Sequence, residues 1–185
     1  MQTDQTPGAT PAPADPARDD QKLARKRATL GFMFSHPVHI ISLGFGSGLA
    51  PIMPGTFGTL FGWLSFDLLY PHLNTLQWWA LIIVGFVAGC WMTGFTARKM
   101  DIDDPGPAVW DEIVAIWLVL LFVMPAGYVA QLCAFLLFRF FDMVKPPPIR
   151  YFDRNLHGGF GIMIDDIIAA GMTLLVLAIW RAITL

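Results

Sequence analysis

Five apolar segments, separated by short polar or proline- and glycine-containing stretches, dominate the chain after residue 27. The spacing of their apolar positions predicts helices over 56–70, 76–96, 108–124, 127–142 and 162–184. Only the second and fifth reach the roughly 20 residues that cross a bilayer comfortably. We expect the three shorter helices to extend into flanking residues, to thin the bilayer locally, or to lie partly buried among their neighbours.

The chain before these helices falls into two parts with different patterns. Residues 28–55 are apolar but interrupted by glycines and prolines, which predicts a re-entrant or interfacial element rather than a continuous spanning helix. Residues 1–27 are polar and rich in Pro, Ala and Asp, which predicts a disordered tail. The pattern therefore predicts an all-α, polytopic membrane bundle of four or five helices, with one membrane-embedded domain over 28–185.

Composition and charge support a membrane protein. Hydrophobic residues make up 55% of the 185 residues and charged residues only 14%, against about a quarter charged in soluble domains. Residues 28–66, 68–97 and 113–138 contain no Asp, Glu, Lys or Arg. The formal net charge of -2 excludes a nucleic-acid binder that relies on a basic surface.

The charged residues are expected to gather on one side of the membrane. The basic cluster at 25–27 predicts a cytoplasmic N-terminus by the positive-inside rule. If all five helices cross, six of the seven later basic residues lie on the cytoplasmic face, Arg181 being the exception. Nine of the ten later acidic residues lie there too, Asp67 being the exception. Ionisable groups beside a bilayer usually serve an ion, a substrate or a proton, so we expect the functional site on this face.

The acidic residues form three clusters in separate segments: Asp101, Asp103 and Asp104; Asp111 and Glu112; Asp165 and Asp166. Carboxylates brought together repel one another, and a bound Mg²⁺ or Ca²⁺ relieves that repulsion. The sequence has no Cys/His cluster of the kind zinc prefers, which favours Mg²⁺. A structural alternative is that Asp111 and Asp165 simply face the positive ends of their helices.

Several polar residues between these clusters suit a bound phosphate. Lys145 and Arg150 flank a proline run, 146–148, that is expected to be extended and stiff. Arg139 could serve phosphate, although its spacing from Asp142 also suits a simple ion pair on one helix face. Glycine-containing turns around Ser47 and Thr56 could supply backbone N–H groups to the substrate, but such turns are also needed for geometry alone.

Four stretches of the sequence resemble a known family in order and spacing: GFGSGLAPIMPGTFG (44–58), VWDE (109–112), FRFFDMVKPPPIRYFDR (138–154) and HGGFGIMIDDIIAAG (157–171). They are similar to the bacterial phosphatidylglycerophosphatase A family, and the resemblance covers about residues 35–175. The family pattern usually has Gly three residues after the Glu of the D-E pair, where this chain has Ala115. We expect that methyl group to alter helix packing slightly without abolishing the chemistry.

The resemblance implies an inner-membrane, Mg²⁺-dependent lipid phosphatase that converts phosphatidylglycerophosphate to phosphatidylglycerol, the precursor of cardiolipin. It implies phosphate-binding roles for Arg139, Lys145 and Arg150. Among the remaining matching positions, it implies metal ligands at Asp104 and Asp165, catalytic groups at Asp142 and His157, and both roles for Asp111, Glu112 and Asp166. His157 would protonate the leaving alkoxide, or it would make only a structural hydrogen bond.

Two other classes of function compete with this interpretation. A small cation- or proton-coupled transporter would use the acids to line a pathway, and it predicts carboxylates near the middle of the spanning helices. A non-catalytic assembly subunit would need no clustered acids. The sequence leaves open the oligomeric state, the number of metal ions, and the choice between attack by water and a phospho-aspartyl intermediate.

Overall fold

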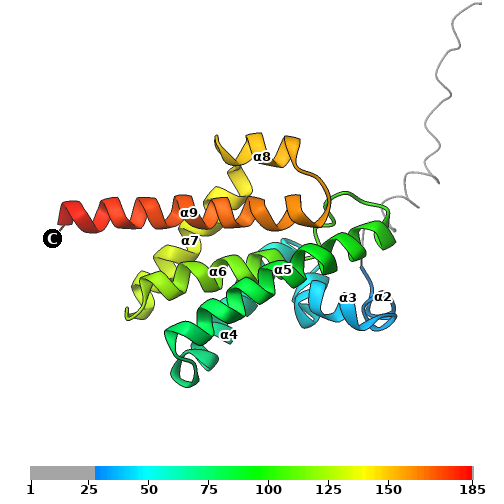
Figure 1. Cartoon of the computed structure of the whole chain (residues 1–185), viewed down its shortest axis with the longest axis horizontal. Coiled ribbons are helices and arrows are strands. Elements are labelled where there is room, and N and C mark those ends of the chain that lie inside the picture. The colour runs from blue at the N-terminus through cyan, green and yellow to red at the C-terminus, as the bar shows by residue number, and fades with distance from the viewer. Residues whose placement is uncertain (1–27, 185) are drawn as a thin grey trace, which may run out of the picture.

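The computed structural model describes residues 28–184, apart from the side chains of residues 153 and 154. Every regular element in that range is a helix (Figure 1). The long ones are α4 (Pro54–Leu69), α5 (Thr75–Met100), α6 (Trp110–Val123), α7 (Tyr128–Val144) and α9 (Gly158–Thr184). The all-helical prediction is confirmed, with each long helix close to its expected bounds. The predicted disordered tail lies outside the described residues.

The segment before α4 is broken into three short helices, as its glycines and prolines predict. They are α2 (Leu30–Phe34), α3 (Pro37–Ser42) and the 3-10 element η1 (Gly44–Leu49). The chain turns sharply inside η1, where Phe45 and Gly46 have φ values of 55° and 102°. α3 packs against α5, and the buried His39 ring places Nδ1 3.0 Å from the Thr96 hydroxyl of α5. This element is therefore fixed to the end of α5 that leads into the 101–109 loop.

α6 is the central helix of the bundle. It packs against α4, α5, α7 and α9, and residues 111–117, 119 and 120 are all buried. Its 14 residues span only about 21 Å. The other helices surround α6, so it needs neither the length nor the lipid-facing surface of an independent membrane span. This explains how a short apolar segment is accommodated.

Glycine residues on α4, which have no side chain, allow this helix to approach α6 closely. A Cβ atom added to Gly58 would meet the Val109 side chain, and one added to Gly62 would meet Ile116. The indole Nε1 of Trp117 donates a 3.0 Å hydrogen bond to the Gly62 carbonyl across the same contact. The glycines of α4 therefore set the distance at which α4 can present its first turn to the start of α6.

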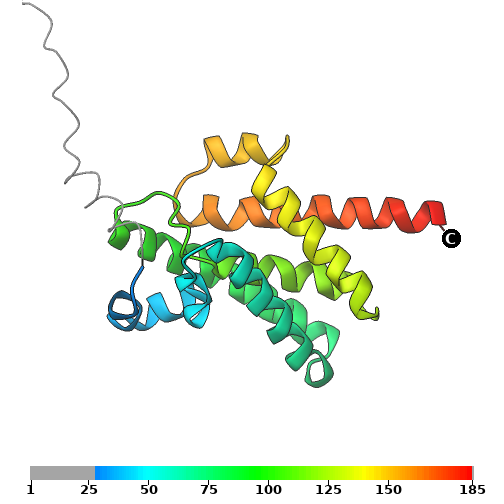
Figure 2. The same ribbon diagram turned by 180° about the vertical axis from the view of Figure 1, so that it is seen from behind.

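Two helices, α5 and α9, are long and apolar enough to cross a membrane. Both remain well exposed, since 44% of the apolar window of α5 and 39% of that of α9 is buried. The C-terminal end of α9, drawn in red, extends beyond the neighbouring helices in both views (Figure 1, Figure 2). Its exposed side chains include Leu175 and Trp180, which are 60% and 68% exposed. An apolar surface of this kind is typical of contact with lipid or another apolar partner.

One helix, α8 (Ile149–Asn155), does not follow from the apolar pattern. The expectation of an extended proline run is wrong at its end: Pro148 has φ −88° and ψ −8° and serves as the N-cap of α8. Pro fits this position because the first N–H groups of a helix have no intrahelical partner. The fully buried Ile149 anchors α8, which packs on α9.

Candidate active site

A small cavity of about 100 Å³ lies where the 101–109 loop, α6, α7 and α9 meet. Among the residues that the structure describes, its one basic lining residue is Lys145, the C-cap of α7. Six carboxylate residues line it: Asp104, Asp111, Glu112, Asp142, Asp165 and Asp166. The fold thus brings together acids from four separate segments, including every residue that the sequence proposed as a metal ligand.

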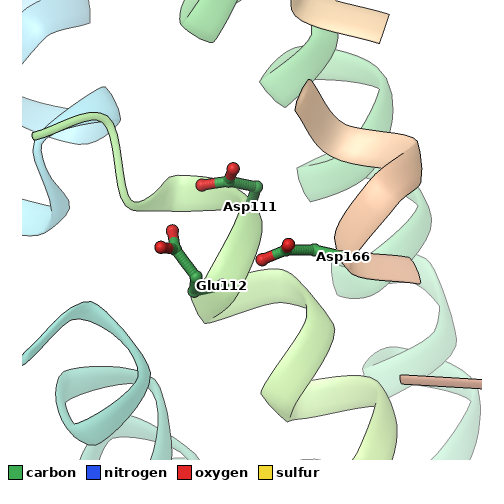
Figure 3. Close-up of side chains that lie close together, drawn as sticks. All are labelled: Asp111, Glu112 and Asp166. Atoms are coloured by element: carbon green, nitrogen blue, oxygen red, sulfur yellow. The ribbon is translucent and has the colours of Figure 1, made fainter. Parts of the chain in front are cut away.

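Three of these carboxylates converge most closely. Asp111, Glu112 and Asp166 each offer one oxygen atom, and these atoms lie within 4.8 Å of one another (Figure 3). The three residues are only 7%, 9% and 4% exposed. One oxygen of each, Asp111 Oδ1, Glu112 Oε2 and Asp166 Oδ2, is buried without a hydrogen-bond partner. Buried polar atoms normally have partners, so this set is suited to holding a cation.

Burial and mutual repulsion make the anionic forms of these groups costly without a cation. Asp111 and Glu112 occupy the first turn of α6, which is not one of the two candidate spans. Burial, and then the neighbouring Glu112 and Asp166, raise the pKa of Asp111 well above its usual range. Burial raises the pKa of Glu112 to about 7. A divalent cation among these oxygens would stabilise the deprotonated forms.

The position at which α9 begins shows that the positive end of a helix accounts for only one of the two acids, Asp111 and Asp165, for which the sequence suggested it. Asp111 does lie in the first turn of α6, where the positive end of the helix favours it. However, α9 begins at Gly158 rather than near 162, and its first turn contains no acidic residue. Asp165 and Asp166 are therefore about two turns inside the helix. The helix end does not explain why these two carboxylates are buried there.

Arg139 lies behind the carboxylates rather than on the cavity wall. Its Nη1 donates to Asp142 Oδ2 at 2.5 Å and to Thr59 Oγ1 at 3.3 Å, and it lies 3.8 Å from Glu112 Oε1. The Thr59 hydroxyl in turn donates to the Gly55 carbonyl at 2.8 Å. Arg139 thus connects α4, α6 and α7, a geometry that suits positioning of the acids more than contact with phosphate.

Gly55 allows this arrangement because it has no side chain. A Cβ atom at Gly55 would collide with Glu112 Oε1 and approach Arg139 Nη2 to 3.1 Å. The sequence pattern pointed to the neighbouring Thr56 in this region, but the contacts with Glu112 and Arg139 come from Gly55 and Thr59. The repeated small residues along α4 are the sequence signal that would have predicted its close approach to α6 and α7.

Of the remaining candidates, Lys145 lines the carboxylate cavity and the others lie outside it. Lys145 does face the carboxylates, with Nζ 3.2 Å from Asp165 Oδ2. The exposed His157 lines an adjoining cavity that also includes Asp104 and Asp165. The residues that line the carboxylate cavity do not include Arg150, Ser47 or Thr56. Ser47 instead donates to the Gly44 carbonyl at 2.8 Å, and Arg150 is exposed on α8.

The fold and the site together define an all-helical enzyme with apolar outer helices and a polar centre of buried carboxylates. The sequence profile of the Phosphatidylglycerophosphatase A family matches residues 40–181. The chain belongs to this family, as its motifs predict, and it is therefore a phosphatase. No solved structure matches the chain.

Curated relatives support the same assignment. A phosphatidylglycerophosphatase A of Escherichia coli (strain K12) is 42% identical over 135 residues, which is 73% of this chain and 78% of the relative. One of Haemophilus influenzae is 43% identical over 135 residues, covering 73% and 83%. A Bacteroides thetaiotaomicron protein, provisionally named a phosphatidylinositol-3-phosphatase, is 37% identical over 151 residues, covering 77% and 92%.

Proposed function

We propose that this protein hydrolyses the terminal phosphate of phosphatidylglycerophosphate to give phosphatidylglycerol and inorganic phosphate, with Mg²⁺ held by Asp111, Glu112 and Asp166. The observation that carries the proposal is the set of three buried carboxylates, each with one oxygen lacking a partner, within 4.8 Å of one another. The names of the two bacterial phosphatidylglycerophosphatase relatives supply the substrate.

The donor set fits magnesium. The converging ligand atoms are all carboxylate oxygens, which Mg²⁺ and Ca²⁺ prefer over the nitrogen and sulfur ligands typical of zinc. A bound Mg²⁺ would supply positive charge at the phosphoryl oxygens, where negative charge must be stabilised during transfer. Asp104 and Asp165 line the same cavity and would complete its carboxylate wall.

The chain's own side chains would bind the phosphate and move the proton. Lys145 would neutralise a phosphate oxygen from the open side of the cavity, and Arg139 would hold Asp142 and Glu112 in place. A water oxygen forms a bond to phosphorus, the bond from phosphorus to the glycerol oxygen breaks, and that oxygen takes up a proton. His157 is the proposed donor of this proton. An alternative path has Asp142 attack first and water hydrolyse the resulting acyl phosphate.

We place the protein in the bacterial inner membrane with this site at the cytoplasmic face, in the supply of phosphatidylglycerol for cardiolipin. Two apolar helices and the basic residues near the site support this orientation. In this orientation the phosphate of the lipid substrate would lie near the depth of the cavity. The acyl chains can then remain in the bilayer during the reaction.

A cation- or proton-coupled transporter fits the structure less well. A transport pathway needs polar or ionisable groups at several depths across the membrane. Neither the stretch 68–97, which covers most of α5, nor the stretch 113–138, which covers α6 beyond Glu112, contains a charged residue. Six carboxylate residues gather instead in one small cavity.

Phosphate release from purified protein tests the proposal. The protein in detergent with Mg²⁺ should release inorganic phosphate from phosphatidylglycerophosphate, and removal of divalent cations with EDTA should stop the release. Asp111→Asn should abolish activity with little change in thermal unfolding, whereas Asp67→Asn, on α4 and outside the residues that line the cavity, should retain activity. Full activity of Asp111→Asn would refute the assignment. Hydrolysis in ¹⁸O-labelled water, with rapid quenching, distinguishes direct attack by water from a phospho-aspartyl intermediate.

A further inference from the structure

A second, larger cavity lies next to the carboxylate site. Its volume is about 380 Å³, and it is formed by the end of α5, the start of the 101–109 loop and the start of α9. Its charged lining residues are Arg98, Asp101 and Asp103. The function proposed above uses none of these three residues, so the cavity needs its own explanation.

A third cavity, of about 60 Å³, adjoins both of these cavities. It shares Asp103 and Gly158 with the larger cavity. It shares Asp104, Ile162 and Asp165 with the carboxylate cavity. Adjoining cavities therefore form a path from the buried carboxylates past the start of α9 to Arg98, lined by both polar and apolar residues.

Arg98 is the cation at the outer end of this path. Its guanidinium lies alongside α5, with Nη1 3.5 Å from the position of a Cβ atom at Gly94, which itself lies against Gly159. Arg98 has no hydrogen bond or ion pair with any side chain that the structure describes. The adjacent Lys99, in contrast, lies over the Phe95 ring at 5.8 Å from its centroid and is not part of the cavity lining. A guanidinium that lines a cavity without a partner is well placed to bind an anion.

We infer that this cavity binds the remainder of the substrate headgroup, with Arg98 pairing with the phosphodiester and Asp103 accepting a hydrogen bond from the glycerol hydroxyl. This inference rests on the proposed function and deepens it. Phosphatidylglycerophosphate carries two phosphate groups joined through a glycerol with one free hydroxyl. When the terminal monoester occupies the carboxylate cavity, the glycerol and the diester must lie outside it.

The dimensions and the charges of the path suit this headgroup. Gly158 and Asp165 are seven residues apart on α9, or about 10 Å along the helix, which a phosphate–glycerol–phosphate unit can span. The lining combines one guanidinium with two carboxylates. Carboxylates repel a phosphate dianion but accept hydrogen bonds from hydroxyl groups. Such a lining fits a singly charged diester beside a hydroxyl better than it fits a second monoester.

The inference makes Arg98 a specificity-determining residue. Phosphatidic acid carries a monoester directly on the diacylglycerol, and it has neither the diester nor the free hydroxyl. It would leave Arg98 without a partner even if its phosphate reached the carboxylates. Recognition of the diester would therefore separate the proposed substrate from other lipid monoesters in the same bilayer.

The test uses full-length protein in neutral-detergent mixed micelles with saturating Mg²⁺. We would measure kcat and KM for phosphatidylglycerophosphate, and the inhibition constants of two soluble probes. Glycerophosphoglycerol carries only the diester and free hydroxyls, and inorganic phosphate represents the monoester. Arg98→Gln removes the cation at an exposed position, Arg98→Lys keeps the charge without the planar fork, and Lys99→Gln is the matched control.

We expect Arg98→Gln to raise KM about tenfold, with kcat little changed. It should weaken inhibition by glycerophosphoglycerol by a similar factor and leave inhibition by inorganic phosphate unchanged. Arg98→Lys should be intermediate, and Lys99→Gln should match the wild type. The inference is overturned if glycerophosphoglycerol does not inhibit the wild type, if both probes weaken equally in Arg98→Gln, or if Lys99→Gln has the same effect as Arg98→Gln.

The same experiment separates this inference from the proposed function. If the wild type hydrolyses phosphatidylglycerophosphate and Arg98→Gln behaves like it, only the headgroup site is refuted. If the wild type does not hydrolyse this lipid, the proposed function and the headgroup site are both refuted.

Discussion

Gly55→Ala adds a single methyl group at the point where α4 meets the carboxylate site. Its Cβ atom would collide with Glu112 Oε1 and lie 3.1 and 3.2 Å from the two terminal nitrogens of Arg139. The Glu112 carboxylate would have to move by about 1 Å to restore normal van der Waals contact. Mg²⁺ requires close to octahedral geometry with ligands at about 2.0–2.1 Å, so this shift should affect metal binding more than folding.

The expected magnitudes separate these two effects. Overpacking costs about 1–3 kcal/mol of unfolding free energy, and replacing glycine by alanine within a helix returns up to about 1 kcal/mol. Changes in the residues that support metal ligands typically weaken metal affinity about 10–100-fold. We therefore expect a modest loss of stability in Gly55→Ala, together with a 10–100-fold increase in the Mg²⁺ concentration needed for half-maximal activity.

Gly171→Ala is the matched control for this substitution. Gly171 also lies within a helix, α9, and a Cβ atom added there meets no atom within 4 Å. The assay titrates Mg²⁺ against phosphate release, and thermal unfolding in the same detergent reports stability. Gly171→Ala should titrate like the wild type. If Gly55→Ala gives the same Mg²⁺ titration as the wild type and Gly171→Ala, the position of the Glu112 carboxylate does not determine Mg²⁺ affinity, which contradicts its role as a ligand.

Three further predictions concern other contacts. Asp166→Asn removes one of the three converging carboxylates, so phosphate release and Mn²⁺ binding measured by electron paramagnetic resonance should both be lost; retention of Mn²⁺ binding would contradict its role as a ligand. Arg139→Lys keeps the charge but cannot bridge the three helices, so it should weaken Mn²⁺ binding about tenfold and leave inhibition by inorganic phosphate unchanged at saturating metal; the opposite pattern would indicate direct phosphate contact. Thr96→Val leaves the buried His39 ring without its hydroxyl partner and should lower the unfolding free energy by about 1–3 kcal/mol without changing KM; unchanged thermal unfolding would show that this hydrogen bond contributes little.

The apolar pattern was sufficient to predict the long helices, because most of their ends lie next to charged, proline or glycine residues. It could not predict that α6 is the central helix. The central position of α6 depends on the close approach of α4, which Gly58 and Gly62 allow. The periodicity of apolar residues shows which face of a helix is buried, but not which helix packs against it. α8 was missed for a related reason. It is only 7 residues long and is held mainly by burial of Ile149, which the local sequence does not reveal.

The carboxylates could be grouped from the sequence, because the predicted topology returns the segments that carry them to the same side of the bundle. The roles of the cations were harder to assign. Arg139 and Lys145 are similar in charge and close in sequence, yet Arg139 points behind the acids while Lys145 lines the cavity. That difference arises from side-chain direction at the end of α7 and from the space left by Gly55. Arg98 was not singled out because an exposed arginine near a membrane is expected from charge asymmetry alone.

Asp111, Glu112 and Asp166 are proposed to bind one divalent cation at which the phosphate is hydrolysed. The most direct measurement is a crystal structure of the protein grown with Mn²⁺, with anomalous diffraction used to locate the metal. If these residues hold the metal, we expect an anomalous peak within coordination distance of carboxylate oxygens from all three, and loss of that peak in Asp166→Asn. A peak located elsewhere in an active protein, with these three carboxylates not bound to it, would contradict the account.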